Sequence, residues 1–470
     1  MADHMYVEQL TPLDLAMPRT YIRVLLVFKT AISTPAVTRI LQDGLDKLSK
    51  QIPWLPGRVF PSTSIQNKAS LEIRSDAGDT PTLVDKGSIA ATYTTLSSRG
   101  FPMEAIPSKV WPVPSMIDDT LSAKGAPVFA ASFFRFADQG VGLCACLHHN
   151  AVDATGLSEV VRLWARNVTE TDFKFSGSPQ GRLERVSKAL SSDLEEISAL
   201  SSESLFALHP EYSNLPPAMP TEFAPCTSKL FTIPIHRINA LKETLRIYAS
   251  NAPTTNVLLC ALIWTTITRV RTNRNPDLES ETSRLVTAVN GRQRISERLS
   301  VPENPYLGNA VLYSLTKCHV GVLTTSDAEA MCSLAQLCEG ISKSQSQSTI
   351  SSRHIAEVYR LVDCMEDYRS LSVGWDLFGS RDLTITSWAD LDLYGMDFGP
   401  MLGKPKFVRL PCMEADGVAI ILPRKRALSE EILEIMIMLR RDDMDSLEND
   451  NMWRTLVSGN KEYGDNNNVA

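Results

Sequence analysis

Residues 147–153 read Leu-His-His-Asn-Ala-Val-Asp and follow a short apolar run, Val141–Cys146, that begins after Gly140. A short apolar run bounded by glycine is typical of a buried strand. After Asp153 the apolar residues recur at helical spacing, at Leu157, Val160, Val161, Trp164 and Val168. The stretch therefore lies on a strand-to-helix connection, where a rigid strand aims a side chain and the loop exposes it to a ligand. This order of elements predicts an α/β fold.

His149 is the one histidine of the seven with an aspartate, Asp153, at the fourth position onward. A neutral imidazole accepts protons near pH 7 because its ordinary pKa is roughly 6.5. The spacing fits two interpretations equally well. In one, His149 is a catalytic base; in the other, it is a buried structural histidine and Asp153 caps the following helix. Regular strand alternation points His148 to the opposite face, where it packs or gives support.

The composition narrows the class of protein. A chain of 470 residues with 43% hydrophobic and 21% charged residues is too long for one ordinary core, so we expect two domains. No apolar run is long enough to span a bilayer, and the start of the chain lacks a secretory pattern, so a cytoplasmic protein is expected.

The net charge of −7 argues against a nucleic-acid partner. The nine cysteines lack metal-ligand spacing, so we expect buried thiols and no metal site.

Changes of pattern along the chain divide it into an N-terminal domain (1–200), a crossover linker (201–228), a C-terminal domain (229–455) and a disordered tail (456–470). In the first domain we expect a strand at Tyr21–Phe28, a helix at Ala36–Lys50, and a hairpin that pairs Val128–Phe136 with the strand before His148. The linker is inferred from its four prolines, Pro216, Pro217, Pro220 and Pro225. In the second domain the pattern predicts strands at Lys229–Ile233 and Arg284–Val289, and helices at Ile235–Tyr248 and after a cap at Thr254 or Thr255.

Further motifs follow in a fixed order: Leu55-Pro56-Gly57-Arg58, Asn290-Gly291-Arg292, Ser387-Trp388, Asp397-Phe398-Gly399 and Lys404-Pro405. Together with the run from His149 to Asp153, they resemble the BAHD family of plant and fungal CoA-dependent acyltransferases, and within it the fungal trichothecene 3-O-acetyltransferase-like members. The resemblance covers most of the chain. Two positions depart from the family pattern: Ala154 replaces the glycine after the aspartate, and Pro400 replaces the tryptophan after Asp-Phe-Gly.

The resemblance implies a two-domain fold like that of chloramphenicol acetyltransferase, in which each domain is a mixed sheet with helices and an active-site channel runs between them. It also implies that the segment at about 404–426 packs on the N-terminal domain. The implied reaction is O-acyl transfer, most often of acetyl, from acyl-CoA to a hydroxyl of a specialised metabolite such as a terpenoid or alkaloid. The protein is then expected to be a monomer that binds small molecules, with no permanent cofactor and no membrane or nucleic-acid partner.

The resemblance also assigns roles to residues. His149 is the general base, Trp388 donates to the oxyanion, and Asp153 pairs with Arg292 to hold the loop. Asp397, Phe398 and Gly399 form a structural loop. By rough alignment, Lys242, Arg424 and the helix start at Thr254 and Thr255 bind CoA phosphates, although ordinary surface charges explain Lys242 and Arg424 as well.

Two other functions stay open. A condensation-type enzyme shares a His-His-x-x-x-Asp motif but takes its acyl group from a carrier protein to form an amide or ester. A non-catalytic metabolite-binding protein keeps the same fold. The Asn290–Arg292 and Gly403–Pro405 motifs favour CoA over a carrier, and the joint presence of His149, Asp153 and Trp388 favours an enzyme over a binder.

Overall fold

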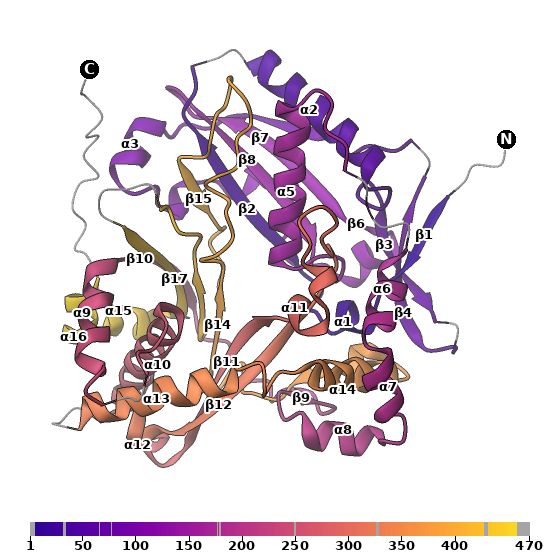
Figure 1. The fold of residues 1–470 in the computed structure, drawn as a ribbon. Helices are drawn as coiled ribbons and strands as arrows, with labels where there is room; N and C mark the ends of the chain where they lie inside the picture. The colour runs from indigo at the N-terminus through magenta and orange to yellow at the C-terminus, as the bar shows by residue number, and fades with distance from the viewer. Residues whose placement is uncertain are drawn as a thin grey trace.

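A computed structural model describes residues 5–31, 34–64, 66–76, 78–175, 177, 180–248, 251–325, 329–426 and 431–457. The expected disordered tail therefore lies outside the described residues beyond Val457. The chain forms three larger sheets and one two-stranded sheet, with helices packed around them (Figure 1).

The sheet that carries the 147–153 stretch has the strand order β15-β2-β8-β7-β5. Its strands are β2 (Tyr21–Phe28), β5 (Leu83–Ser88), β7 (Phe129–Arg135), β8 (Val141–His148) and β15 (Phe407–Arg409). Only β5 and β7 pair in parallel, so the sheet is mixed. Helices α2 (Thr34–Gln51) and α5 (Ala154–Thr169) lie side by side over one face (Figure 1).

Both faces of the central strands β2 and β8 are buried, which explains their continuous apolar sequences. Alternate residues of β2, such as Val24 and Leu26, pack under α2 and α5. The residues between them, such as Leu25, face a second apolar cluster that also contains Cys144 and Cys146. All nine cysteines are free, and these two are buried on one face of β8, as predicted. Because both faces of β8 are packed, the strand fixes the position of the turn that begins at His149.

A four-stranded antiparallel sheet borders this domain. Its order is β1-β4-β3-β6, with β1 (Tyr6–Gln9), β3 (Arg58–Thr63), β4 (Ala69–Ser75) and β6 (Ala126–Pro127). A short helix, α1 (Pro12–Leu15), follows β1 and is fixed by a capping box in which Thr11 and Asp14 bond each other's backbone N–H. Asp14 is buried beside the 147–153 turn, where its carbonyl accepts a hydrogen bond from the Asn150 side chain.

The second half forms a six-stranded mixed sheet with the order β10-β17-β16-β14-β11-β12. The strands are β10 (Cys226–Pro234), β11 (Thr282–Asn290), β12 (Val311–His319), β14 (Leu383–Ser387), β16 (Val418–Ile421) and β17 (Ile432–Arg440). Helices α9 (Ile235–Leu245), α10 (Thr255–Arg274), α12 (Val320–Leu323), α13 (Ala330–Ser344), α15 (Arg441–Asn449) and α16 (Asn451–Leu456) belong to this half. Helix α10 is buried nearly all round, which is why its sequence shows no polar face.

A smaller part of the 404–426 segment packs on the first domain than expected. Only β15 pairs with β2 of the first sheet, whereas Val418–Ile421 returns to the second sheet as β16 between β14 and β17. The segment is therefore divided between the two sheets, because the apolar residues Ala419 and Ile421 of β16 are buried in the core of the second half. The C-terminal part of the chain adds an edge strand to the N-terminal sheet (Figure 1).

The crossover is also more structured than a linker. It contains α8 (Ser202–Leu208) and β9 (Tyr212–Ser213), which pairs with β13 (Ser372–Val373). With α6 (Arg182–Ala189) and α7 (Ser191–Glu196) it packs around α14 (Ser352–Asp363) in one apolar cluster. The prolines mark only the stretch between β9 and β10. In the described part of the chain, we find no helix with the length and apolar character that crossing a membrane requires.

Candidate active site

The turn after β8 is held on every side by hydrogen bonds. The His149 N–H donates to the Thr20 carbonyl at 2.9 Å, and the N–H groups of Ala151 and Val152 donate to the His148 carbonyl at 2.8 and 3.1 Å. The Asn150 side chain donates to the carbonyls of Asp14 and Met17 at 2.9 and 2.7 Å. These bonds fix the backbone from which the His149 side chain projects.

His149 is half-buried, and its Nδ1 lies inside the protein. Burial lowers the pKa of His149 below its usual range, while the residue's own backbone carbonyl, the Asp153 charge and Asn309 act in the opposite direction. The net lowering keeps the imidazole neutral at pH 7. A neutral ring has the free lone pair that a general base needs.

His148 has the supporting role that strand alternation predicts. Only 3% of it is exposed, its Nδ1 accepts the Asn150 N–H at 3.1 Å, and its ring meets Tyr21 edge-on. Burial lowers the pKa of His148 to about 3, so this ring also stays neutral. The His148 ring thus links the turn to the end of β8, and it is more buried than the His149 ring.

Asp153 forms a buried, two-pronged ion pair with Arg292. The guanidinium nitrogens Nη1 and Nη2 each lie 2.9 Å from one carboxylate oxygen. The N–H groups of Gly156 and Ala310 also donate to this carboxylate, at 2.9 and 3.0 Å. Asp153 thus caps helix α5 and pairs with Arg292 at once. Its oxygens are fully used in holding the turn.

Arg292 in turn binds the loop that follows β11 and the short helix α11 (Arg292–Ile295). Its Nε donates to the Tyr306 carbonyl at 2.8 Å and its Nη2 to the Gly308 carbonyl at 2.6 Å. It is only 2% exposed. A planar guanidinium can serve a carboxylate and carbonyls together in this way, which a lysine cannot. Arg292 therefore ties the second half of the chain to the base of the His149 turn.

The replacement of the family glycine by Ala154 is harmless, because Ala154 is the first residue of α5 and has helical φ. The nearby Gly156 is the residue that must stay small. A β-carbon there would lie 2.2 Å from the Leu307 carbonyl oxygen. The glycine thus permits the close approach of α5 to the loop that Arg292 holds.

Asn309 and Asp14 belong to the site but had no predicted role. Asn309 is fully buried; its backbone N–H and its Nδ2 both donate to Asp14 Oδ1 at 2.9 Å, and Nδ2 also donates to the His149 carbonyl at 2.8 Å. Asp14 is fully buried, and burial raises its pKa. Arg182 supports the same network by donating to the Ala151 carbonyl at 2.6 Å. Positions 14, 149 and 309 are far apart in sequence, so only a motif that included Asn309 could have signalled this link.

Trp388 directly follows β14 and is held by a bond from its backbone N–H to the Ile421 carbonyl at 2.8 Å. Its ring is nearly buried, at 6% exposure. It belongs to the same apolar cluster as Ala151 and Val152 of the turn and Leu307 of the Arg292-bound loop. Trp388 and the His149 turn therefore share one apolar core, and the role of the indole stays a prediction.

The expected CoA-binding residues also come together. Lys242 on α9 donates through Nζ to Thr255 Oγ1 at 2.8 Å, and Thr254 caps α10 by accepting the Val257 N–H at 3.2 Å. Burial and the neighbouring positive charge of Arg424 lower the pKa of Lys242. The Arg424 side chain is paired with Glu431 at 2.7 Å. Two cations and a helix N-terminus at one place form a physically reasonable anion site.

The Asp397-Phe398-Gly399 loop is a docking element of the first sheet. The Asp397 carboxylate accepts the Gly399 N–H at 2.9 Å, and Gly399 has a φ of +84°, which favours glycine. Phe398 is fully buried and meets Phe28 and Trp164 edge-on at centroid distances of 5.4 and 5.9 Å. These contacts are those of a packed loop, and the structural role that the resemblance implies stays a prediction.

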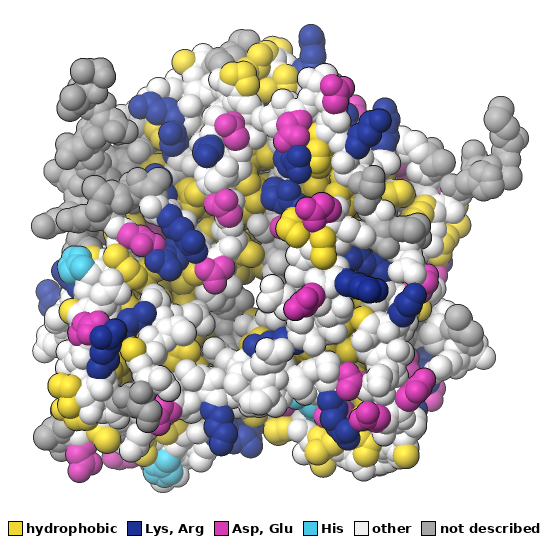
Figure 2. Space-filling model, viewed as in Figure 1, with side chains coloured by type: hydrophobic (Ala, Val, Ile, Leu, Met, Phe, Trp, Pro, Cys, Tyr) yellow, Lys and Arg dark blue, Asp and Glu magenta, His cyan; other side chains and the backbone are white. Residues whose placement is uncertain are grey.

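Figure 2 shows this face of the molecule hollowed near its centre, where the two halves meet. One cavity of about 300 Å³ lies beside the Arg292-bound loop and is lined by Trp54, Arg182 and Tyr306 among others. His149 is not one of its lining residues. The predicted channel that leads to His149 therefore stays a prediction.

Comparison with known proteins gives two family matches. The model described as "Transferase family" matches residues 110–453, and the model described as "Trichothecene 3-O-acetyltransferase-like N-terminal domain" matches residues 20–167. Trichothecene 8-O-acetyltransferase of Fusarium sporotrichioides is 27% identical over 94% of this chain and 96% of its own length. O-acetyltransferase ptmV of Penicillium ochrochloron is 26% identical over 94% of this chain and 95% of its own.

The structural comparison agrees. The crystal structure of F. sporotrichioides TRI101 complexed with coenzyme A and T-2 superimposes with a TM-score of 0.80 at 21% identity, covering 97% of this chain and all of the other. At this identity the likeness shows the fold, and it confirms the predicted two-domain α/β architecture. Since the first family model spans 344 of the 470 residues (110 to 453), the chain belongs to the Transferase family, the BAHD-like acyltransferases that its motifs predicted.

Proposed function

We propose that this protein is a CoA-dependent O-acyltransferase that moves an acetyl group from acetyl-CoA to a hydroxyl of a specialised metabolite, such as a terpenoid or an alkaloid. The curated relatives described above are named O-acetyltransferases, and the TRI101 crystal structure contains coenzyme A and T-2. The observation that carries the proposal is a neutral, half-buried His149 on a turn that the Asp153–Arg292 pair holds in place. Acetyl-CoA is then a co-substrate, and no permanently bound cofactor is needed.

His149 acts as the general base. As the acceptor oxygen attacks the thioester carbonyl, its proton passes to the free nitrogen of the imidazole. The tetrahedral intermediate then collapses, the C–S bond breaks, and the departing CoA sulfur takes the proton back from His149. The transfer is direct, with no acyl group on the enzyme. Such positioned proton transfer contributes on the order of a hundred- to ten-thousandfold to the rate.

Trp388 supplies the donor for the negative oxygen of the intermediate, through its indole N–H. Its backbone is fixed by Ile421, and its ring is packed in the same large apolar core as Ala151 and Val152 of the His149 turn. A donor that is aimed in advance costs no reorganisation during the reaction, and one such donor is worth roughly 3 kcal/mol. Asp153 and Arg292 touch no reacting atom in this mechanism; they position His149.

Lys242, Arg424, Thr254 and Thr255 bind the CoA phosphates. Lys242 contacts Thr255 at the N-terminus of α10, where backbone N–H groups and the helix dipole also favour an anion, and Arg424 is close enough for its charge to act on Lys242. Arg424 follows β16, and its N–H lies 3.4 Å from the carbonyl of Ala389, the neighbour of Trp388. A CoA molecule bound by its phosphates at this end can therefore extend toward Trp388.

Substituting Lys242 by alanine is expected to raise the KM for acetyl-CoA about tenfold while kcat changes little, because a charge-assisted contact to phosphate is worth roughly 1.5 kcal/mol. Steady-state thiol release at varied acetyl-CoA checks this. Arg246→Ala is the matched control, since Arg246 follows the same helix, is exposed and forms an exposed ion pair with Glu243. An unchanged KM in Lys242→Ala would remove this residue from the CoA site.

The proposed function is tested by incubating the protein with acetyl-CoA and a panel of hydroxylated terpenoids and alkaloids, with thiol release and product mass as readouts. Acceptor-dependent thiol release with formation of an acetyl ester supports the proposal. Acyl transfer from carrier-bound thioesters only would indicate the condensation-type alternative, and binding without turnover would indicate a metabolite-binding protein. The monomeric state and the cytoplasmic location remain predictions.

A further inference from the structure

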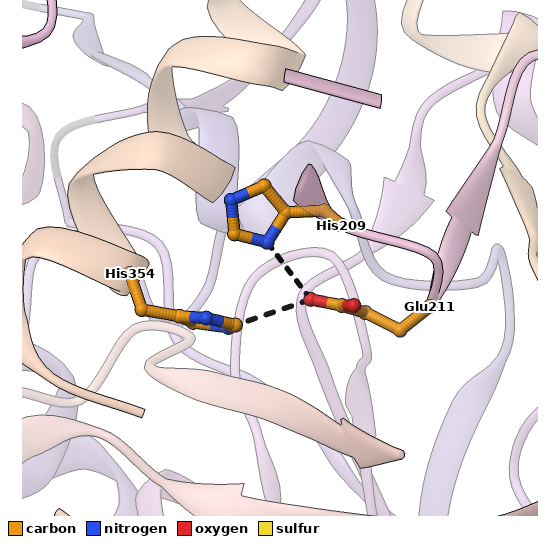
Figure 3. A group of neighbouring side chains, drawn as sticks. All are labelled: His209, Glu211 and His354. Carbon is orange, nitrogen blue, oxygen red and sulfur yellow. Dashed lines mark hydrogen bonds and ion pairs between the residues drawn. The ribbon is translucent and has the colours of Figure 1, made fainter. Parts of the chain in front are cut away.

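A group of buried polar side chains joins the crossover to α14. His209 follows α8, Glu211 precedes β9, and His354 lies on α14. In Figure 3 the three side chains point toward one another, and dashed lines join the Glu211 carboxylate to each of the two imidazoles. We propose that these residues bind one divalent transition-metal ion, zinc in the first place, and that the ion ties the crossover to α14.

The distances between the side chains fit a metal site. Glu211 Oε1 lies 3.0 Å from His209 Nδ1 and 3.4 Å from His354 Nε2, and the three ligand atoms lie within 4.8 Å of one another. Zinc binds nitrogen and carboxylate oxygen at about 2.0–2.2 Å in a tetrahedron, so neighbouring ligand atoms lie about 3.3 Å apart. The observed separations bracket this value. Two imidazoles and a carboxylate are also a ligand set that zinc uses when its fourth position holds water.

A second carboxylate sets the orientation of His209. Glu357 Oε2 lies 3.2 Å from His209 Nε2, and Arg353 Nε donates to Glu357 Oε1 at 3.1 Å. An ionised carboxylate paired with an arginine can accept a hydrogen bond from the Nε2–H tautomer of His209, which is the tautomer that leaves Nδ1 free for a metal ion. The lone pair of Nδ1 then faces Glu211. Histidines that bind metals in proteins almost always give their other N–H to such a partner.

The space between the three side chains suits a cation, because the Glu211 carboxylate lies close to both imidazoles. His209 and Glu211 are 1% and 4% exposed, so in the Nε2–H tautomer bulk water does not compensate the two acceptors that would face each other at 3.0 Å. His354 Nε2 is a further buried nitrogen without a hydrogen-bond partner among the described residues. The nearby Arg294 does not fill this place, because its guanidinium donates to the carbonyls of Gln345, Ser346 and Ile350. A metal ion would bind all three ligand atoms at once.

The position of the group suggests a structural role. Helix α14 packs against α1 and α11, which carry Asp14 and Arg292, so it supports the elements that hold the His149 turn. Metal ions that join distant segments add their binding free energy to folding. No metal site was expected because the cysteines lack metal-ligand spacing. The ligands proposed here are two histidines and a glutamate at positions 209, 211 and 354, which come together only in the folded chain.

Zinc binding to the full-length protein tests the proposal. After removal of metals with a chelator, calorimetric titration with Zn²⁺ is expected to show one site per chain with micromolar or tighter affinity, and the melting temperature is expected to rise. His354→Ala should weaken binding at least a hundredfold, and Glu357→Gln about tenfold, as for other residues that orient a ligand. X-ray absorption should find two nitrogen and at least one oxygen neighbour at about 2.0–2.2 Å.

The matched control is His236→Ala, because His236 is exposed on α9 and far from the group in sequence and fold; it should bind zinc as the wild type does. His354 is 18% exposed at its side chain, so its substitution tests the site even if His209→Ala fails to fold. Absence of stoichiometric Zn²⁺ binding, or equal binding by His354→Ala, would overturn the proposal. Neither result depends on acetyl transfer, so the zinc-binding experiment and the test of the proposed function can fail independently.

Discussion

Replacing His149 by alanine is expected to lower kcat/KM for acetyl transfer by at least a hundredfold, and by up to about ten-thousandfold, because no other group on the turn can take the acceptor proton. The Asp153 carboxylate is bound to Arg292, Gly156 and Ala310, and His148 bonds the Asn150 N–H. Neither can replace the missing base. Thiol release from acetyl-CoA with a competent acceptor measures the loss.

The His149→Ala variant should otherwise resemble the wild type. The backbone of His149 holds the turn through Thr20 and Asn309, and alanine keeps those two hydrogen bonds. We therefore expect an unchanged melting temperature and unchanged CoA binding. His236→Ala, an exposed histidine on α9, serves as the control for loss of an imidazole. Turnover close to that of the wild type in His149→Ala would refute its role as the base.

Asp153→Asn is expected to cost about 3–5 kcal/mol of unfolding free energy, because it leaves the Arg292 guanidinium buried without its counter-ion. The ion pair is closed from solvent, with side-chain exposures of 3% and 1%. The same variant loosens the turn, so activity should fall together with stability. Urea-induced unfolding followed by fluorescence measures the free energy, and thiol release measures the activity.

Glu170→Gln is the matched control, since Glu170 caps the other end of α5 and pairs with Arg166 at 2.8 Å. The two side chains are 42% and 46% exposed, and an exposed pair of this kind contributes less than about 1 kcal/mol. If Asp153→Asn were no more destabilising than Glu170→Gln, the Asp153–Arg292 pair would not be what holds the turn. A loss of stability with full activity would also contradict the positioning role.

The elements around the site could be predicted because their signals are local. Strand β2 has the predicted bounds, Tyr21–Phe28, and β7 and β8 form the predicted hairpin. Thr254 caps α10, one of the two predicted choices. In each case, apolar periodicity or a capping residue within a few positions determines the backbone. The Asp153–Arg292 pair is different; it came from the family resemblance, and the geometry agrees with it.

Contacts between distant segments could not be predicted in this way. The bonds from Asn309 to Asp14 and to the His149 carbonyl join three parts of the chain, and nothing in the local sequence of each marks a partner. The same holds for His209, Glu211 and His354. The return of Val418–Ile421 to the second sheet also depends on competition between two cores for one apolar segment. Such choices are made by tertiary packing and not by local propensity.

The pH dependence of wild-type kcat/KM tests the central claim most directly, because it reports the titration of the free enzyme's base without any substitution. Burial lowers the pKa of His149 below its ordinary 6.5, so the ring is neutral above that pKa and protonated below it. The rate is therefore expected to be level near pH 7 and to fall in acid, with a midpoint below 6.5 that is absent from the residual activity of His149→Ala. A midpoint above 6.5, or the same acid limb in His149→Ala, would contradict the account.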